Sequence, residues 1–130
     1  MSVGLLLVTH EGIAQSLLDT AQKMLGTCPL GTQILEVPLD SDTQQMQQQG
    51  QQFIESLQQG NGVLILTDLY GGTPSNIAHR LLDNNNIKMV AGINLPMLIR
   101  VLNYPQLNLH DMALKAVSGG HDGVLLCDCK

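Results

Sequence analysis

A histidine and an aspartate stand where two apolar segments of the sequence end. An apolar run at 3–8 precedes His10, and a second run at 63–66 precedes Asp68. Continuous apolar runs of this length predict strands that are buried on both faces, as in a parallel sheet. Because ligands and chemistry gather at the carboxyl edge of such sheets, we expect the two side chains to meet there if their strands are neighbours.

This pair of residue types predicts nucleophilic chemistry at the histidine. A carboxylate that accepts the proton of one imidazole nitrogen fixes the tautomer and makes the other nitrogen a better nucleophile. The carboxylate also stabilises the positive charge that the ring acquires when it is substituted. We therefore predict that His10 is the nucleophile and that Asp68 orients it.

The loop after this aspartate carries the groups that an incoming phosphoryl group needs. The four candidate residues are Gly71, Gly72, Thr73 and Ser75. The glycines lack a Cβ, so the backbone can come close, while the threonine and serine supply hydroxyl groups. Thr73 is also expected to cap a helix that Pro74 opens, whose first turn offers unpaired N–H groups. The helix start around Gly12 is expected to supply further donors, so the arrangement favours a transient phosphoryl adduct on the histidine.

Each of these features also has an ordinary structural interpretation. A histidine at a strand end is more often a satisfied polar residue than a nucleophile, and an aspartate there is often a turn or capping residue. The sequence contains neither a Gly-x-x-x-x-Gly-Lys P-loop nor a Gly-x-Gly-x-x-Gly fingerprint. The catalytic interpretation is favoured because both stretches follow core strands.

Strand and helix patterns alternate along the chain. The expected strands cover 3–8, 33–39, 63–68, 88–93 and 124–127, and the expected helices cover 13–25, 43–59, 74–82, 97–102 and 109–118. The glutamine-rich segment 43–59 is assigned to a helix rather than to a low-complexity tract because its apolar residues recur at helical spacing. A chain break is expected at Gly119-Gly120. The order predicts a single α/β domain over 1–130, with a small doubly wound, mostly parallel sheet of four strands plus a C-terminal edge strand.

Composition argues against several classes of function. Aromatic residues make up 2% of the chain, the formal net charge is −5, and no run of lysine or arginine occurs. These features argue against nucleic-acid binding and against an anionic membrane surface. No apolar run approaches the roughly 20 residues of a membrane span, and no signal peptide is recognised. With three cysteines and no disulfide-scaffold spacing, the composition predicts a cytoplasmic protein.

The remaining candidates carry weaker signals. His79 is expected on a helix surface, His110 near a helix start and His121 in a loop. Cys127 and Cys129 together with His121 resemble half of a metal site, but the second half of a structural zinc site is missing, so no metal is predicted. Tyr70 is expected to line the crevice or an interface.

Three motifs together resemble the EIIA domain of mannose-family phosphotransferase systems (PTS). They are Val-Thr-His-Glu-Gly at 8–12, Thr-Asp-Leu-Tyr-Gly-Gly-Thr-Pro-Ser-Asn at 67–76 and Val-Ala-Gly-Ile-Asn-Leu-Pro-Met-Leu at 90–98. The resemblance implies a phosphotransferase component in which Nε2 of His10 accepts phosphate from HPr and passes it to an EIIB partner for sugar uptake. Asp68 would hold Nδ1, and Thr73 and Ser75 would lie near the phosphate. No cofactor beyond the transient phosphohistidine is implied, and the membrane is reached only through the PTS permease.

The resemblance also implies a homodimer whose C-terminal strand crosses to the partner's sheet as an antiparallel edge. The segment 124–127, after a hinge at Gly119-Gly120, would fill this role and cover an edge that could otherwise pair wrongly. The Cys-Asp-Cys end at 127–129 is not part of the resemblance.

Two other functions were weighed against the phosphoryl carrier. A stand-alone EIIA can be regulatory, with the phosphorylation state of His10 controlling which partner protein is bound. A receiver-like domain of similar topology needs an acidic pair after the first strand to hold magnesium and an aspartate acceptor after the third. The first strand here ends in Thr9-His10, which argues against the receiver.

Overall fold

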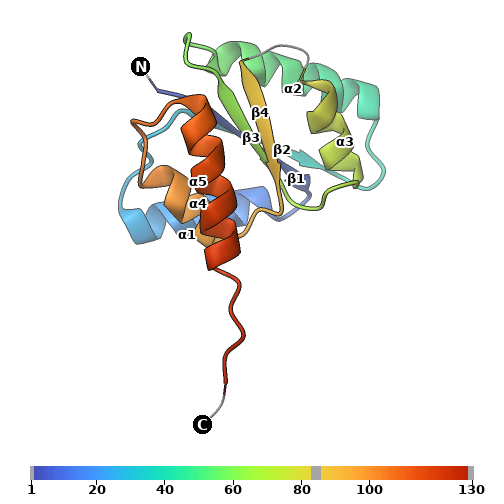
Figure 1. The fold of residues 1–130 in the computed structure, drawn as a ribbon. Coiled ribbons are helices and arrows are strands. Elements are labelled where there is room, and N and C mark those ends of the chain that lie inside the picture. The colour runs from blue at the N-terminus through green and yellow to red at the C-terminus, as the bar shows by residue number, and fades with distance from the viewer. Residues whose placement is uncertain (1, 83–85, 129–130) are drawn as a thin grey trace.

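The computed structural model describes residues 2–82 and 86–128. Strands and helices alternate through most of this length (Figure 1). They are β1 (Gly4–His10), α1 (Ala14–Leu25), β2 (Thr32–Val37), α2 (Thr43–Leu57), β3 (Val63–Thr67), α3 (Thr73–Arg80), β4 (Ile87–Ala91), α4 (Leu95–Leu102) and α5 (Leu109–Asp122). None of the helices in the described part is both long and apolar enough to cross a membrane.

The four strands form one parallel sheet in the order β2-β1-β3-β4. Val8 of β1 is in register with Leu35 of β2 and with Thr67 of β3, so the ends of the central strands lie level with one another. The expected four-stranded parallel α/β sheet is therefore confirmed. The first and third strands are neighbours, which is the condition for His10 and Asp68 to meet at one edge.

Helices cover both faces of the sheet, which divides the aliphatic core in two. α1, α4 and α5 cover one face, and α2 and α3 cover the other (Figure 1). Leu5 and Leu7 of β1 belong to the core on the first face, and Leu6 and Val8 to the core on the second. All four side chains are completely buried. Since full burial of one leucine or valine stabilises a fold by about 1.5–3 kcal/mol, this strand is a rigid base for the residue that follows it.

The glutamine-rich segment is helical, as predicted. The carboxylate of Asp42 begins α2 by accepting hydrogen bonds from the backbone N–H groups of Gln44 and Gln45, at 3.0 and 3.4 Å. Ile54 and Leu57 are buried on the sheet side, while most of the glutamines face outward. The apolar stripe thus decides the conformation of a stretch whose composition alone is ambiguous.

The expected chain break and hinge at Gly119-Gly120 are wrong, because α5 continues through both residues to Asp122. A Cβ at Gly119 would lie 2.5 Å from Cβ of Arg100, and one at Gly120 would lie 2.7 Å from Cε of Met97. The two glycines therefore let α5 pack closely against α4 and do not interrupt the helix.

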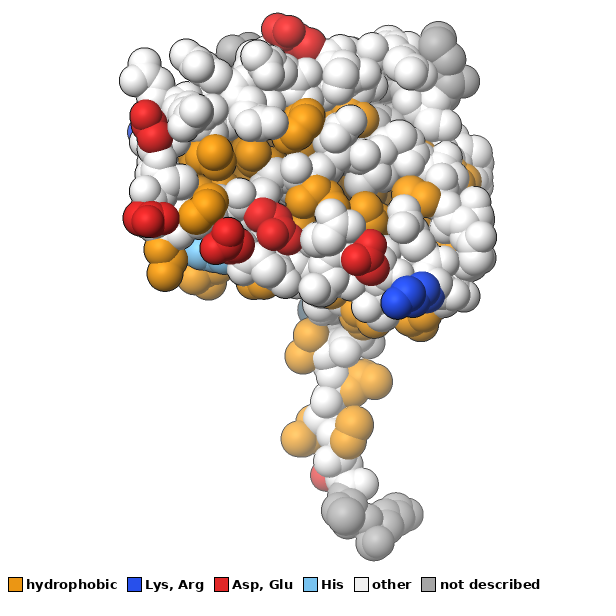
Figure 2. All heavy atoms as spheres, turned by 180° about the vertical axis from the view of Figure 1, so that it is seen from behind, with side chains coloured by type: hydrophobic (Ala, Val, Ile, Leu, Met, Phe, Trp, Pro, Cys, Tyr) orange, Lys and Arg blue, Asp and Glu red, His pale blue; other side chains and the backbone are white. Residues whose placement is uncertain are grey.

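The expected strand at 124–127 is not formed within the single chain. After α5 the described residues run away from the body as an exposed tail (Figure 1), and hydrophobic side chains lie along it (Figure 2). Val124, Leu125 and Leu126 are 74%, 76% and 95% exposed. Among the described residues no strand pairs with this segment. Exchange of the strand between two subunits stays a prediction.

Candidate active site

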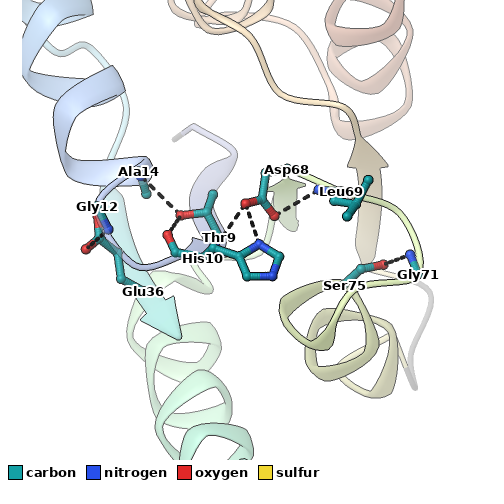
Figure 3. Close-up of polar contacts among 9 residues, drawn as sticks. All are labelled: Thr9, His10, Gly12, Ala14, Glu36, Asp68, Leu69, Gly71 and Ser75. Atoms are coloured by element: carbon teal, nitrogen blue, oxygen red, sulfur yellow. Dashed lines mark hydrogen bonds and ion pairs between the residues drawn. The ribbon is translucent and has the colours of Figure 1, made fainter. Parts of the chain in front are cut away.

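The structure brings His10 and Asp68 together at the carboxyl edge of the sheet. His10 is the last residue of β1, and Asp68 directly follows β3. Nδ1 of the imidazole lies 2.8 Å from Oδ2 of the carboxylate (Figure 3). The same Oδ2 accepts a hydrogen bond of 3.0 Å from the backbone N–H of His10, and Oδ1 accepts one of 2.8 Å from the N–H of Leu69. One carboxylate thus fixes both the ring and the backbone of the histidine.

The electrostatics keep this carboxylate ionised. Burial by itself raises the pKa of Asp68, but hydrogen bonds from the backbone and ring of His10 and from the N–H of Leu69 lower it, as does the charge of His10. The net effect is a pKa below the ordinary value of 3.8. Because an ionised carboxylate only accepts hydrogen bonds, Nδ1 carries the proton and Nε2 of the neutral ring has a free lone pair.

The histidine is partly open to solvent, while its aspartate is mostly covered. Their side chains are 32% and 13% exposed. This combination suits a nucleophile. The attacking nitrogen must be accessible to a substrate, whereas the carboxylate that orients the ring must be shielded so that water does not replace its hydrogen bond to the ring.

The two glycines of the loop after β3 serve different purposes. A Cβ on Gly72 would lie 3.1 Å from Cε1 and 3.6 Å from Nε2 of His10, so this backbone passes directly beside the free nitrogen. Gly71 has a φ of +91° and open space around its Cα, so it is needed for the turn itself. The loop therefore comes close to the imidazole at the second glycine, while its approach to a phosphoryl group stays a prediction.

The start of α3 is left without a side-chain cap. The expected cap by Thr73 is wrong: this residue is the first of the helix, and Gly72 occupies the N-cap position. Thr73 is exposed, whereas Ser75 is 2% exposed and its Oγ accepts a hydrogen bond of 3.3 Å from the N–H of Gly71 (Figure 3). The N–H groups in the first turn of a helix have no intrahelical acceptor, and Pro74 has no N–H at all. Since the N-cap makes no side-chain hydrogen bond, the N–H groups of Thr73 and Ser75 remain as donors at the start of α3.

The expected donors at the start of α1 are already occupied. The carboxylate of Glu36, on β2, accepts a hydrogen bond of 2.9 Å from the backbone N–H of Gly12 (Figure 3). It accepts a second one, also of 2.9 Å, from the N–H of Gln15. The sequence prediction that Gly12 supplies donors to a phosphoryl group is therefore wrong for this state of the chain. Glu36 was missed, although a lone glutamate between Leu35 and Val37 at the end of a strand is a visible signal.

The other candidates lie apart from this site or outside the described residues. His79, His110 and His121 are exposed on α3 and α5. Cys127 is exposed in the tail, and Cys129 lies outside the described residues. Across 2–82 and 86–128, no group of three or more histidine, cysteine, aspartate or glutamate side chains could hold a metal ion.

Comparison with known families and curated proteins gives consistent matches. The EIIA-man family model, described as "PTS system fructose IIA component", matches residues 4–117. The mannose-specific EIIAB component of Escherichia coli strain K12 is 31% identical over 127 residues, which are 95% of this chain. The chain spans only 39% of that relative's length. The fructose-specific EIIA component of Bacillus subtilis strain 168 is 37% identical over 79 residues, covering 58% of this chain and 54% of the relative.

Solved structures show the same fold. The mannose/sorbose specific IIA subunit of the phosphotransferase system from Enterococcus faecalis superposes with a TM-score of 0.88 at 26% identity, covering 100% of this chain and 98% of that one. The phosphotransferase component EIIA from Streptococcus agalactiae gives a TM-score of 0.83 at 21% identity, with 95% of each chain covered, a likeness of fold.

Proposed function

The chain belongs to the EIIA-man family of PTS components, and we propose that it carries phosphoryl groups on Nε2 of His10. Components of this kind act in phosphoryl transfer during sugar uptake. The observation that supports His10 most directly is the 2.8 Å contact between its Nδ1 and Oδ2 of Asp68. This contact supports a tautomer with the proton on Nδ1, in which Nε2 would be free to act as the nucleophile.

The proposed transfer is a direct exchange of one phosphorus–nitrogen bond for another. The lone pair of Nε2 attacks the phosphorus of phosphohistidine on HPr, and the bond between that phosphorus and the donor nitrogen breaks. His10 becomes a phosphorylated imidazolium whose Nδ1 proton stays hydrogen-bonded to the Asp68 carboxylate, which offsets the new positive charge. In the second step a histidine of an EIIB partner attacks the same phosphorus, and His10 returns to its neutral form.

The loop after β3 is the proposed binding site for the transferred group. Gly72 leaves room beside Nε2, and Gly71 makes the turn that brings it there. The unpaired N–H groups in the first turn of α3, together with the hydroxyl of Thr73, would donate to the phosphoryl oxygens. Ser75 would hold the loop through its contact with the N–H of Gly71. These hydrogen-bond donors would stabilise the negative charge of the phosphoryl group, and we propose no metal or organic cofactor for this step.

Exposed apolar residues around His10 support docking of partner proteins on this edge. Ile13, Leu39, Leu69 and Tyr70 are 38%, 97%, 63% and 74% exposed, and they lie in the loops that follow β1, β2 and β3. Apolar side chains that gather at one edge are typical of protein interaction sites. We propose that HPr and EIIB use this surface in turn, in the cytoplasm, so that the membrane is reached only through the permease.

We also propose that two chains form a homodimer by exchanging the tail. β4 is an edge strand within the chain, and a groove of about 430 Å³ lies beside it, lined in part by Met89, Leu114 and Val117. In a dimer, the exposed apolar tail of each chain would pair with the β4 edge of the other chain and cover it.

The proposed carrier role is tested by incubating the protein with phosphoenolpyruvate, enzyme I and HPr. Intact mass should show one added phosphate, and peptide mapping under alkaline conditions should place it on His10. The variant His10→Ala should stay unmodified, whereas His79→Ala, which removes an exposed histidine from α3, should be phosphorylated normally. Asp68→Ala should slow transfer without abolishing it.

Two outcomes would change the proposal. Absence of phosphate on the wild-type protein, with HPr shown to be charged, would overturn the carrier role. Phosphate that forms on His10 but is not passed to any EIIB would favour the regulatory alternative.

A further inference from the structure

Two helix N-termini flank the candidate nucleophile, and they differ in what occupies them. α1 begins after the loop that follows His10, and α3 begins after the loop that carries Asp68. A helix N-terminus offers N–H groups and the positive end of a dipole, so either one is suited to bind an anion. The N-cap of α3 makes no side-chain hydrogen bond, whereas the N–H groups at the start of α1 are taken.

Four consecutive backbone N–H groups at the start of α1 have partners. Those of Gly12 and Gln15 donate to Oε1 and Oε2 of Glu36, each at 2.9 Å. The N–H of Ala14 donates to Oγ1 of Thr9 at 3.1 Å, and that of residue 13 donates to the carbonyl of His10 at 3.4 Å. The carboxylate of Glu36 therefore occupies the place of a bound anion, with its two oxygens in charge-assisted hydrogen bonds.

The same contacts hold the backbone of the nucleophile. The hydroxyl of Thr9 donates to the carbonyl of His10 at 2.8 Å while accepting from Ala14 (Figure 3). Glu36 is in register with Thr9 across β1 and β2, so the two side chains lie on one face of the sheet. The imidazole of His10, one residue further along, lies beside Gly72 of the other helix.

We propose that Glu36 is a positioning residue that closes the N-terminus of α1 to phosphate, which leaves the N-terminus of α3, beside the imidazole, open to a phosphoryl group on His10. A phosphate at α1 would have to displace a carboxylate that already holds two N–H groups, and would then lie beside its negative charge. That the phosphoryl group binds at α3 rests on the proposed function, because it requires phosphorylation of His10. That Glu36 keeps phosphate from the N-terminus of α1 does not depend on the proposed function.

The closure is tested with inorganic phosphate as the probe, read by the amide shifts of Gly12 and Gln15 in NMR spectra of the full chain. In the wild type these amides should not respond. In Glu36→Ala both should shift saturably as phosphate is added. Glu36→Gln, which keeps the size of the side chain and one acceptor oxygen, should give a weaker response in a protein of near-native stability. Glu11→Gln removes a neighbouring exposed carboxylate, and this control should behave like the wild type.

The direction of the phosphoryl group is tested by phosphorylating the wild type with charged HPr. The amides of Thr73 and Ser75 should then shift, while those of Gly12 and Gln15 keep their positions. The Glu36→Ala variant should accept phosphate roughly tenfold more slowly, as expected when a reacting group loses a supporting contact.

Different results would overturn the closure of α1 and the binding of the phosphoryl group at α3. Phosphate-induced shifts at Gly12 and Gln15 in the wild type, or none in Glu36→Ala, would overturn the closure. Movement of the same two amides on phosphorylation of the wild type would overturn the assignment to α3. If the wild type is not phosphorylated at all, the proposed function fails, and the titration with inorganic phosphate still decides the role of Glu36.

Discussion

The imidazole of His10 is oriented by a carboxylate that also holds the backbone of the same residue. Oδ2 of Asp68 lies 2.8 Å from Nδ1 and accepts the His10 N–H at 3.0 Å, while Oδ1 is used by Leu69. A rotation of the ring away from this geometry would therefore break one contact while the other keeps the carboxylate in place. This double anchoring limits the loss of orientation that a mobile histidine would suffer before each transfer.

The lowered pKa of Asp68 predicts a contribution to acid stability. A carboxyl group whose folded pKa lies below its unfolded value of about 3.9 stabilises the fold above the unfolded pKa, and the contribution is lost as the pH falls through the folded pKa. The free energy of unfolding of the wild type should therefore exceed that of Asp68→Asn near pH 5 and approach it towards about pH 2. Urea unfolding at a series of pH values measures this difference. A difference in the free energy of unfolding that stays constant from about pH 5 to about pH 2 would contradict the prediction.

The two loop glycines predict opposite phenotypes for the same substitution. At Gly72 the backbone has an ordinary conformation, φ −77° and ψ 170°, but the Cβ of Gly72→Ala would lie 3.1 Å from Cε1 of His10, the ring atom next to Nε2. Phosphorylation should therefore slow with little change in stability. Gly71→Ala meets no atom within 4 Å but places alanine at φ +91°, which should cost about 1–2 kcal/mol. Phosphorylation rates and urea unfolding of the pair separate the two effects, and equal losses of stability would refute the assignment.

At the scale of elements, a contact can be predicted from the sequence when both of its residues directly follow strands of the core. His10 and Asp68 could be placed at one edge because each comes after a continuous apolar run, and such runs are typical of central parallel strands. Glu36 could not be placed, because caps are normally expected within the helix's own first residues, and this one lies 24 positions from Gly12 and 21 from Gln15. Its role as a cap of α1 becomes visible only when the structure places β2 next to β1.

The glycines of α5 illustrate a second limit of sequence reasoning. A Gly-Gly pair predicts a break when only local propensity is considered. The decisive fact is the partner helix: Gly119 and Gly120 face Arg100 and Met97 of α4, which no local pattern identifies. The tail at 124–127 shows the reverse case, since an apolar, strand-like pattern finds no partner within its own chain.

This packing predicts unequal costs for two neighbouring alanines. Gly119→Ala should destabilise the chain by about 1–3 kcal/mol, because its Cβ would lie 2.5 Å from the rigidly placed Cβ of Arg100. Gly120→Ala meets the flexible end of Met97, and the better helix propensity of alanine offsets part of the strain, so its effect should be smaller. Urea denaturation of both variants provides the comparison. Stabilisation by Gly119→Ala would show that the helices can separate without loss.

At the scale of the whole molecule, we predict that the tail is needed for dimer formation through the β4 edge but not for folding of the single chain. A chain that ends at Gly123 should unfold with nearly the same midpoint at low concentration, since Val124, Leu125 and Leu126 are mostly exposed and bury little surface against the described residues. It should sediment as a monomer, whereas removal of residues 128–130 alone should leave the proposed dimer intact. A dimeric 1–123 chain would mean that another surface holds the subunits together.

The pairing of the nucleophile with its carboxylate across 58 positions also sets an order of events during synthesis. On the ribosome, β1 and β2 emerge first, and His10 is exposed to the cell before β3 exists. The nascent chain then holds the histidine but not the group that orients it, so under the proposed function charged HPr would meet an acceptor that reacts slowly. The acceptor would reach full reactivity only when β3 inserts beside β1, so rapid phosphorylation of His10 would indicate that the centre of the sheet has formed.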